Sequence, residues 1–365
     1  MIKANDIEMV KLGGMTPEER ERYEKNKIEI NKKVSSLIAE ATKNAKLECC
    51  ILCSKPCSSF CNSHSIPQFA LKRIAEDGKV MLPLQDEILT IGKDTGVNKA
   101  GTFHIICRDC DSRTFQLYED PNAYNSKPTD QMLAQIALKD VLLMISKRNQ
   151  EREQYKLVGE QAEFLKDFAD EKIYLGDFDL RDYGEDLEYA RSSLDGRKSN
   201  RYYLCFYTVL DYVVPYVAQS SVTLISDFED SIVNNIYSQE QKYRIKAIHS
   251  VFPLKSTSAI LLFIEDGVKR YRKFYRSLRK LPNDDQLAAI NYLVFSYTEN
   301  VFMNPTTHKE LRKNDLFMDM CRKSTDFRSH TPFPLDDPLE AAVKEFSLSK
   351  RNEIPNLLSR EYALN

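Results

Sequence analysis

The sequence predicts an α+β protein in which a small zinc-stapled module precedes a larger mixed domain. The first observation is two Cys-x-x-Cys pairs, Cys50/Cys53 and Cys107/Cys110, which supply the four thiolates that a tetrahedral structural zinc ion needs. The second is a change after residue 201 from helical periodicity to segments rich in β-branched and aromatic residues. The third is the length of 365 residues, which favours about two domains.

The composition is that of a globular protein. Hydrophobic residues make up 42% of the chain and charged residues 29%, so the chain can bury a sizeable core. The net charge of −2 gives no global basic field, so any contact with nucleic acid must come from a local patch. The first residues lack an apolar signal-peptide core, and no apolar run reaches the ~18 residues of a membrane span. We therefore expect a cytoplasmic protein without membrane segments.

Helical patterns dominate the N-terminal half of the chain. Residues 16–46 are expected to form one helix, because Thr16, Pro17 and Glu19 are typical of a capped helix start. A second helix is expected over residues 130–156, where apolar residues recur at helical spacing. A short helix over 112–119 is expected directly after the second cysteine pair.

The C-terminal half combines expected strands with two strongly charged segments. Residues 160–188 carry 11 acidic and 3 basic residues, but interleaved aromatic side chains argue against a disordered tail. Residues 202–209 and 258–263 have the composition of strands. The basic run 269–280 has an apolar stripe at helical spacing, which favours a packed amphipathic helix over a phosphate-binding one. These patterns divide the chain into an N-terminal helix (1–46), a cysteine module (47–126), a helical connector with the acidic segment (127–200) and a mixed α+β domain (201–365).

The cysteines are concentrated in the module. Seven of the nine lie between residues 49 and 110, and in a reducing compartment such a cluster indicates metal ligands more than disulfides. The alternative is that they are small buried hydrophobic residues. The two pairs are far apart in the chain, so other ligands compete with them for zinc, namely Cys49, Cys57, Cys61 and His64.

The segment His64-Ser65-Ile66-Pro67, with a cysteine knuckle on each side, resembles the HNH, or His-Me finger, endonucleases that carry a zinc-stapled treble clef. The resemblance covers residues 47–120. It implies a ββα-like treble-clef module in which His64 is the general base that activates water, and Asp111 is a ligand of a catalytic Mg²⁺ or Mn²⁺ ion. The rest of the chain is vaguely similar to an uncharacterised bacterial family with a His-x-x-Pro segment that is suspected in phage defence.

Three positions differ from the pattern of the HNH family. Thr102 stands where the family has its middle asparagine, Asp111 replaces its final histidine, and Ser63 replaces an acid or a second histidine. Aspartate is a competent oxygen ligand for Mg²⁺, so metal-dependent cleavage stays open. The alternative for His64 is a zinc ligand or a structural histidine that bonds a knuckle carbonyl.

Two classes of function follow. The leading hypothesis is a metal-dependent endonuclease or nuclease-like effector acting on DNA or RNA, with bacterial phage defence as its setting. The alternative is a zinc-stabilised nucleic-acid-binding or protein-binding regulator without catalysis. A homodimer is a third hypothesis, in which the acidic segment of one copy faces the basic run of another. The residues expected to contact nucleic acid are Arg108, Arg113, Lys269, Arg272 and Arg276.

Overall fold

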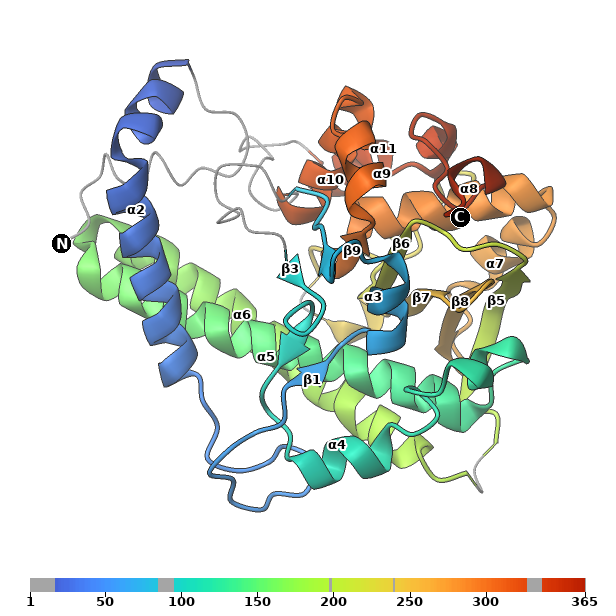
Figure 1. The fold of residues 1–365 in the computed structure, drawn as a ribbon, viewed down its shortest axis with the longest axis horizontal. Coiled ribbons are helices and arrows are strands. Elements are labelled where there is room, and N and C mark those ends of the chain that lie inside the picture. The colour runs from blue at the N-terminus through green and yellow to red at the C-terminus, as the bar shows by residue number, and fades with distance from the viewer. Residues whose placement is uncertain (1–16, 85–94, 197–198, 239, 327–336, 365) are drawn as a thin grey trace.

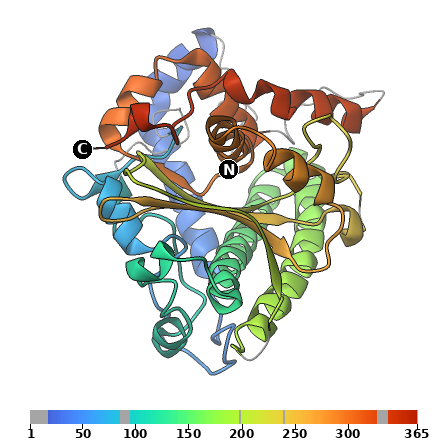
Figure 2. The same cartoon turned by 90° about the vertical axis from the view of Figure 1, so that its right-hand side faces the viewer.

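A five-stranded antiparallel sheet forms the centre of the molecule. The structure is a computed structural model, and it describes residues 17–84, 95–196, 199–238, 240–326 and 337–364. Figure 2 shows the sheet edge-on between two layers of helices. Its strand order is β5-β8-β7-β6-β9, with β5 at Tyr202–Leu210, β6 at Tyr216–Val222, β7 at Ala247–Pro253, β8 at Ser258–Glu265 and β9 at Val301–Met303.

The central strands are apolar on both faces, because helices cover both. Along β8, Leu261 and Phe263 belong to one core cluster, whereas the alternate residues Leu262 and Ile264 belong to the other. This follows from the two-residue period of a strand, which sends successive side chains to opposite faces. A strand buried on both faces therefore has a continuous apolar sequence, as in Ser258–Glu265.

Two long helices cover one face of the sheet. Helix α5 (Asp130–Gln161) begins at Thr129, whose hydroxyl accepts a hydrogen bond from the backbone N–H of Met132. It packs along α6 (Lys166–Ser193), which contains most of the acidic segment (Figure 1). Four acidic side chains of α6 are paired with basic residues from other segments, in the ion pairs Arg148–Asp179, Arg152–Asp177, Arg244–Asp182 and Lys246–Asp186.

The helices of the C-terminal part cover the other face. Helix α8 is buried on every side, and its residues Ile290, Tyr292 and Val294 are fully inaccessible. Pro282 lies directly before α8 and separates it from α7. The helices of this layer are α7 (Arg272–Leu278), α8 (Asn283–Tyr297), α9 (Pro305–Leu311), α10 (Asp315–Asp326) and α11 (Pro338–Glu345).

The cysteine module lies on the same face of the sheet as α5, and its apolar residues share one core with that helix. The helix expected over 16–46 is confirmed as α2. The helix expected over 112–119 is wrong over most of its length, because α4 spans Arg108–Thr114 and residues 115–119 are not helical. The protein is α+β, as expected. The elements of this part are α2 (Pro17–Asn44), β1 (Ser63–His64), α3 (Gln68–Ile74), β2 (Lys79–Val80), β3 (Thr95–Gly96), β4 (Thr102–Phe103) and α4 (Arg108–Thr114).

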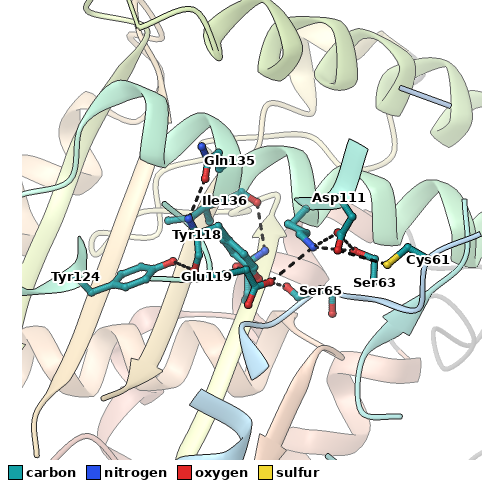
Figure 3. Close-up of polar contacts among 11 residues, drawn as sticks. Cys61, Ser63, Ser65, Asp111, Tyr118, Glu119, Tyr124, Gln135 and Ile136 are labelled. Atoms are coloured by element: carbon teal, nitrogen blue, oxygen red, sulfur yellow. Dashed lines mark hydrogen bonds and ion pairs between the residues drawn. The ribbon is translucent and has the colours of Figure 1, made fainter. Parts of the chain in front are cut away.

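A buried polar network joins the module to α5 and the sheet (Figure 3). The hydroxyl of Tyr118 donates to the carbonyl oxygen of Ser65 at 2.6 Å and lies 3.1 Å from Oε1 of Gln219 on β6. The backbone N–H of Tyr118 donates to Gln135 on α5 at 2.8 Å, and the Gln219 amide donates to the carbonyl of Ile136. Because every partner is buried, the module and the sheet are fixed to one another.

Candidate functional site

The first cysteine pair lies on a tight loop. The N–H of Cys50 donates to the carbonyl of Lys55, and the N–H of Ser54 donates back to the carbonyl of Cys50 at 2.8 Å. Ser54 has a φ of 57°, the left-handed conformation that reverses the chain directly after Cys53. This turn brings Cys50 and Cys53 to the same side of the loop, as a zinc knuckle requires.

The second pair begins helix α4. Cys107 is its N-cap, and its sulfur accepts a hydrogen bond from the N–H of Cys110, one turn later. The N–H of Cys107 in turn donates to the sulfur of Cys50 at 3.3 Å, which joins the two pairs. Helix α4 starts here because the Cys107 sulfur caps it, although cysteine is not among the residues usually preferred at a helix N-cap.

The four sulfur atoms of Cys50, Cys53, Cys107 and Cys110 lie within 4.8 Å of one another. Burial raises the pKa of the Cys50 thiol, but N–H donors from Cys107 and the knuckle outweigh it and lower the pKa to about 7. Four convergent thiols with backbone N–H support fit a structural zinc ion. Within the described part of the chain, the competing residues stay outside this group, namely Cys49, Cys57, Cys61 and His64.

Beside the four-cysteine cluster, a pair of short strands and a helix form a ββα arrangement. Strands β1 and β4 are antiparallel, with Ser63 opposite Phe103 and His64 opposite Thr102. Helix α4 follows β4 and presents Asp111 to this strand pair. The two residues expected to be catalytic, His64 and Asp111, line one open cleft of about 480 Å³.

His64 is held in one orientation by the backbone. Its Nε2 lies 3.0 Å from the carbonyl oxygen of Val97, and because a carbonyl only accepts, Nε2 carries the hydrogen. The lone pair of neutral His64 is therefore on Nδ1. Burial lowers the pKa of His64 below its usual 6.5, so the ring is neutral at pH 7 and able to accept a proton.

Asp111 is engaged by three neighbours. Its Oδ1 accepts from the Ser63 hydroxyl at 2.6 Å and from the Lys139 ammonium group at 2.8 Å, while its Oδ2 is 3.4 Å from the sulfur of Cys61 (Figure 3). Burial alone raises the pKa of the carboxyl, but Lys139 and Ser63 outweigh it and lower the pKa below its usual value. Asp111 is therefore ionised and ion-paired.

Lys139 comes from α5 and is completely buried. Its Nζ lies 2.7 Å from the Ser63 hydroxyl, 3.8 Å from Glu119 and 4.2 Å from the centre of the Phe115 ring. The ammonium group therefore contacts both Ser63 and Asp111, the residue that the resemblance makes a ligand of the catalytic ion. A divalent ion bound to Asp111 would meet this charge at close range, so these residues do not fit a magnesium or manganese site.

The cleft has an acidic lining. Asp111, Glu119 and Asp120 contribute carboxyl groups, and no lysine or arginine is found among the described residues that line it. Amide and hydroxyl groups of Asn62, Gln68, Ser112 and Gln116 complete the walls. Without a bound cation, such a lining repels phosphate and attracts positive charge.

The expected basic contacts do not form one surface. Arg108 and Arg113 are exposed on α4, beside the cleft. Lys269, Arg272 and Arg276 are also exposed, but they belong to the α7 region, which packs against the opposite face of the sheet. The apolar stripe of that region is buried, as the amphipathic interpretation predicts, with Tyr271, Phe274 and Leu278 in the core.

Sequence reasoning missed Lys139 and the roles of Ser63 and Glu119. One signal was available, since Lys139 and Asp140 are a charged pair inside an otherwise apolar helical run. A charge at such a position implies a buried partner. The partner, Asp111, could not be identified because it lies 28 residues away in the chain.

Comparisons with known proteins add no assignment to this geometry. No protein-family model, curated protein or solved structure matches the chain. None of the described helices has the length and apolar character that crossing a membrane would need.

Proposed function

We propose that this chain is a zinc-stabilised binding protein whose cleft beside His64 receives a basic side chain of a protein partner, without cleaving nucleic acid. The observation that carries the proposal is the ion pair between Lys139 and Asp111 at 2.8 Å. The ammonium group stands where a nuclease of the HNH type would hold its metal ion. A fully buried lysine cannot leave this position without unpairing Asp111 and losing its packing on Phe115.

The charge of the cleft supports a basic protein partner over a nucleic acid. Glu119 and Asp120 are exposed at the rim, and Lys139 neutralises only one charge beneath them. A lysine or arginine of a partner would find carboxylates within reach, which favours fast and selective association. A phosphate group would meet the same carboxylates with no metal ion to compensate for them.

Fluorescence anisotropy tests this proposal. Labelled oligo-arginine, oligo-glutamate and single-stranded DNA are titrated with the zinc-loaded full chain, and only oligo-arginine is expected to bind. The double variant Glu119→Gln/Asp120→Asn should weaken that binding by about tenfold, since it removes two rim charges. Glu340→Gln, an exposed glutamate on α11, is the matched control. The proposal is contradicted if the wild type, the double variant and the control bind oligo-arginine equally, or if the wild type binds DNA more tightly than oligo-arginine.

The second candidate is an HNH-like endonuclease, and the orientation of His64 favours it. A histidine whose Nε2–H is fixed by a carbonyl, with Nδ1 as acceptor, is arranged as a general base requires. Plasmid DNA and RNA are incubated with the protein in Mg²⁺ or Mn²⁺, beside His64→Ala. Under the binding proposal neither protein cleaves. Cleavage by the wild type that His64→Ala lacks would establish the endonuclease and overturn the binding proposal.

A further inference from the structure

A second cavity, unrelated to the cysteine module, lies between α5, α6 and the sheet. Its volume is about 320 Å³, at the lower end of the ~300–1,000 Å³ range of small-molecule sites. Ala137, Val141 and Met144 of α5 form an apolar wall. The rings of three tyrosines also line it, namely Tyr183, Tyr189 and Tyr202, together with the aliphatic side chains of Ile245, Ile248 and Val268.

A buried carboxylate in this lining lacks a hydrogen bond. Asp140 on α5 is 2% exposed, and its Oδ2 accepts from the N–H of Ser221 on β6 at 2.9 Å. Its Oδ1 is buried and has no hydrogen-bond partner among the described residues, and the same holds for the hydroxyl of Tyr202. Buried polar atoms are almost always paired, so an orphaned carboxylate oxygen beside a cavity indicates a ligand that donates to it.

Each cation among the described residues of the lining already has a carboxylate partner. Lys246 pairs with Asp186, which also lines the cavity, whereas Arg244 pairs with Asp182 and Lys242 with Glu240, both outside the lining. Glu265 also lines the cavity; burial and the nearby Asp186 raise its pKa to about 7. The lining therefore has carboxyl groups in excess of the available positive charge, and hydrogen-bond donors suit it better than acceptors.

We propose that this cavity binds a small heteroaromatic molecule with an exocyclic amino group, which donates to Oδ1 of Asp140 while the ring lies among the tyrosines. Aromatic side chains and an anionic acceptor in one cavity lining suit a flat ring with a donor at its edge. The proposal is independent of the function of the cleft beside His64, because the two lining sets share no residue.

Two nucleoside pairs supply the probes. Adenosine and inosine, like cytidine and uridine, differ in whether the ring carries an amino or a carbonyl group at one position. The zinc-loaded full chain is titrated with each by calorimetry, and thermal unfolding is followed in parallel. Adenosine or cytidine should bind about 10- to 100-fold more tightly than its carbonyl partner, since the carbonyl places an acceptor against Asp140.

Asp140→Asn is the decisive variant. Its side-chain oxygen can keep the bond to Ser221, whereas its NH₂ group replaces the orphaned oxygen and changes an acceptor into a donor. The preference should therefore invert toward inosine or uridine, and a variant that fails to fold would not show an inverted preference. Tyr202→Phe should weaken the binding of both the amino and the carbonyl nucleoside. The matched control is Asp211→Asn, which removes a charge from an exposed ion pair.

Two results would overturn the proposal. One is the absence of binding by all four nucleosides to the folded wild type. The other is an amino preference that Asp140→Asn leaves unchanged, because the ligand would then be recognised elsewhere. Inversion of the preference in Asp140→Asn, with Asp211→Asn like the wild type, supports it.

Discussion

The ammonium nitrogen of Lys139 lies 2.8 Å from Oδ1 of Asp111. The lysine is 1% exposed and the aspartate 25%, so the pair is largely shielded from water. Each charge relies on the other, because a buried ion without its partner is costly. This pair joins helix α4 of the cysteine module to helix α5 of the central layer.

Replacing Lys139 should lower the stability of the protein and free Asp111 to bind a divalent ion. Lys139→Met keeps the aliphatic stem but leaves Asp111 unpaired, so we expect a loss of about 3 kcal/mol of unfolding free energy in urea. Adding Asp111→Asn should restore part of this loss, because the uncompensated carboxylate disappears. Lys139→Met should also gain Mn²⁺ binding, seen by paramagnetic resonance, whereas the wild type binds none. If the double variant loses the sum of the unfolding free energies that the two single variants lose, the pairing of Lys139 with Asp111 is contradicted.

Removing one zinc ligand should unfold the cysteine module. Cys53→Ser is expected to purify without stoichiometric zinc and to lose a large part of the ~10–16 kcal/mol that zinc binding contributes to folding in small zinc modules. Elemental analysis and near-ultraviolet circular dichroism measure the two effects. Cys49→Ser, at an exposed cysteine outside the ligand group, should match the wild type. Equal zinc loss in both variants would show that the ligand set is different.

The hydroxyl of Tyr118 should contribute measurably to stability. Tyr118→Phe leaves the carbonyl of Ser65 and the amide of Gln219 without their buried partner. We expect a loss of about 1–3 kcal/mol in chemical denaturation, without loss of zinc. Tyr174→Phe, at an exposed tyrosine of α6, should change stability by less than about 0.5 kcal/mol. A stability of Tyr118→Phe equal to that of the wild type rules out the network as a fixed connection.

Acid should destabilise the protein through His249. This histidine of β7 is buried beside Thr298, and burial lowers its pKa to about 3 from the usual 6.5. The unfolded chain therefore binds a proton that the folded chain does not between about pH 3 and 6.5. Its contribution is complete above pH 6.5 and is lost as the pH falls, at up to about 1.4 kcal/mol per pH unit. In His249→Gln, the unfolding free energy measured by urea denaturation should depend less on pH between about pH 3 and 6.5. If the wild type and the variant show the same pH dependence, His249 is excluded as its source.

The sequence predicted the parts of the fold that depend on local pattern. Capping residues located the start of α5, and the apolar runs located the strands near residues 202 and 258. The clustering of the four cysteines was predictable because two Cys-x-x-Cys pairs are typical of a shared metal site. Local propensity failed at α4, where the helix begins at its cap, Cys107, within the second cysteine pair.

The cleft was predicted only in outline. His64 and Asp111 do share it, but what each one bonds is decided by tertiary contacts. Val97 offers only its carbonyl to His64, and a backbone atom has no sequence signature. Lys139 reaches Asp111 because α5 passes beneath the strand pair β1–β4. That arrangement depends on how the module packs against the sheet.

Residues 139 and 140 are neighbours on α5, yet their side chains lie at two different sites, the cleft beside His64 and the cavity lined by tyrosines. Lys139 is bonded to Asp111 beneath the acidic cleft, and Asp140 is bonded to β6 at the cavity lined by tyrosines. One helix therefore supplies a buried charged side chain to each of the two sites from successive positions.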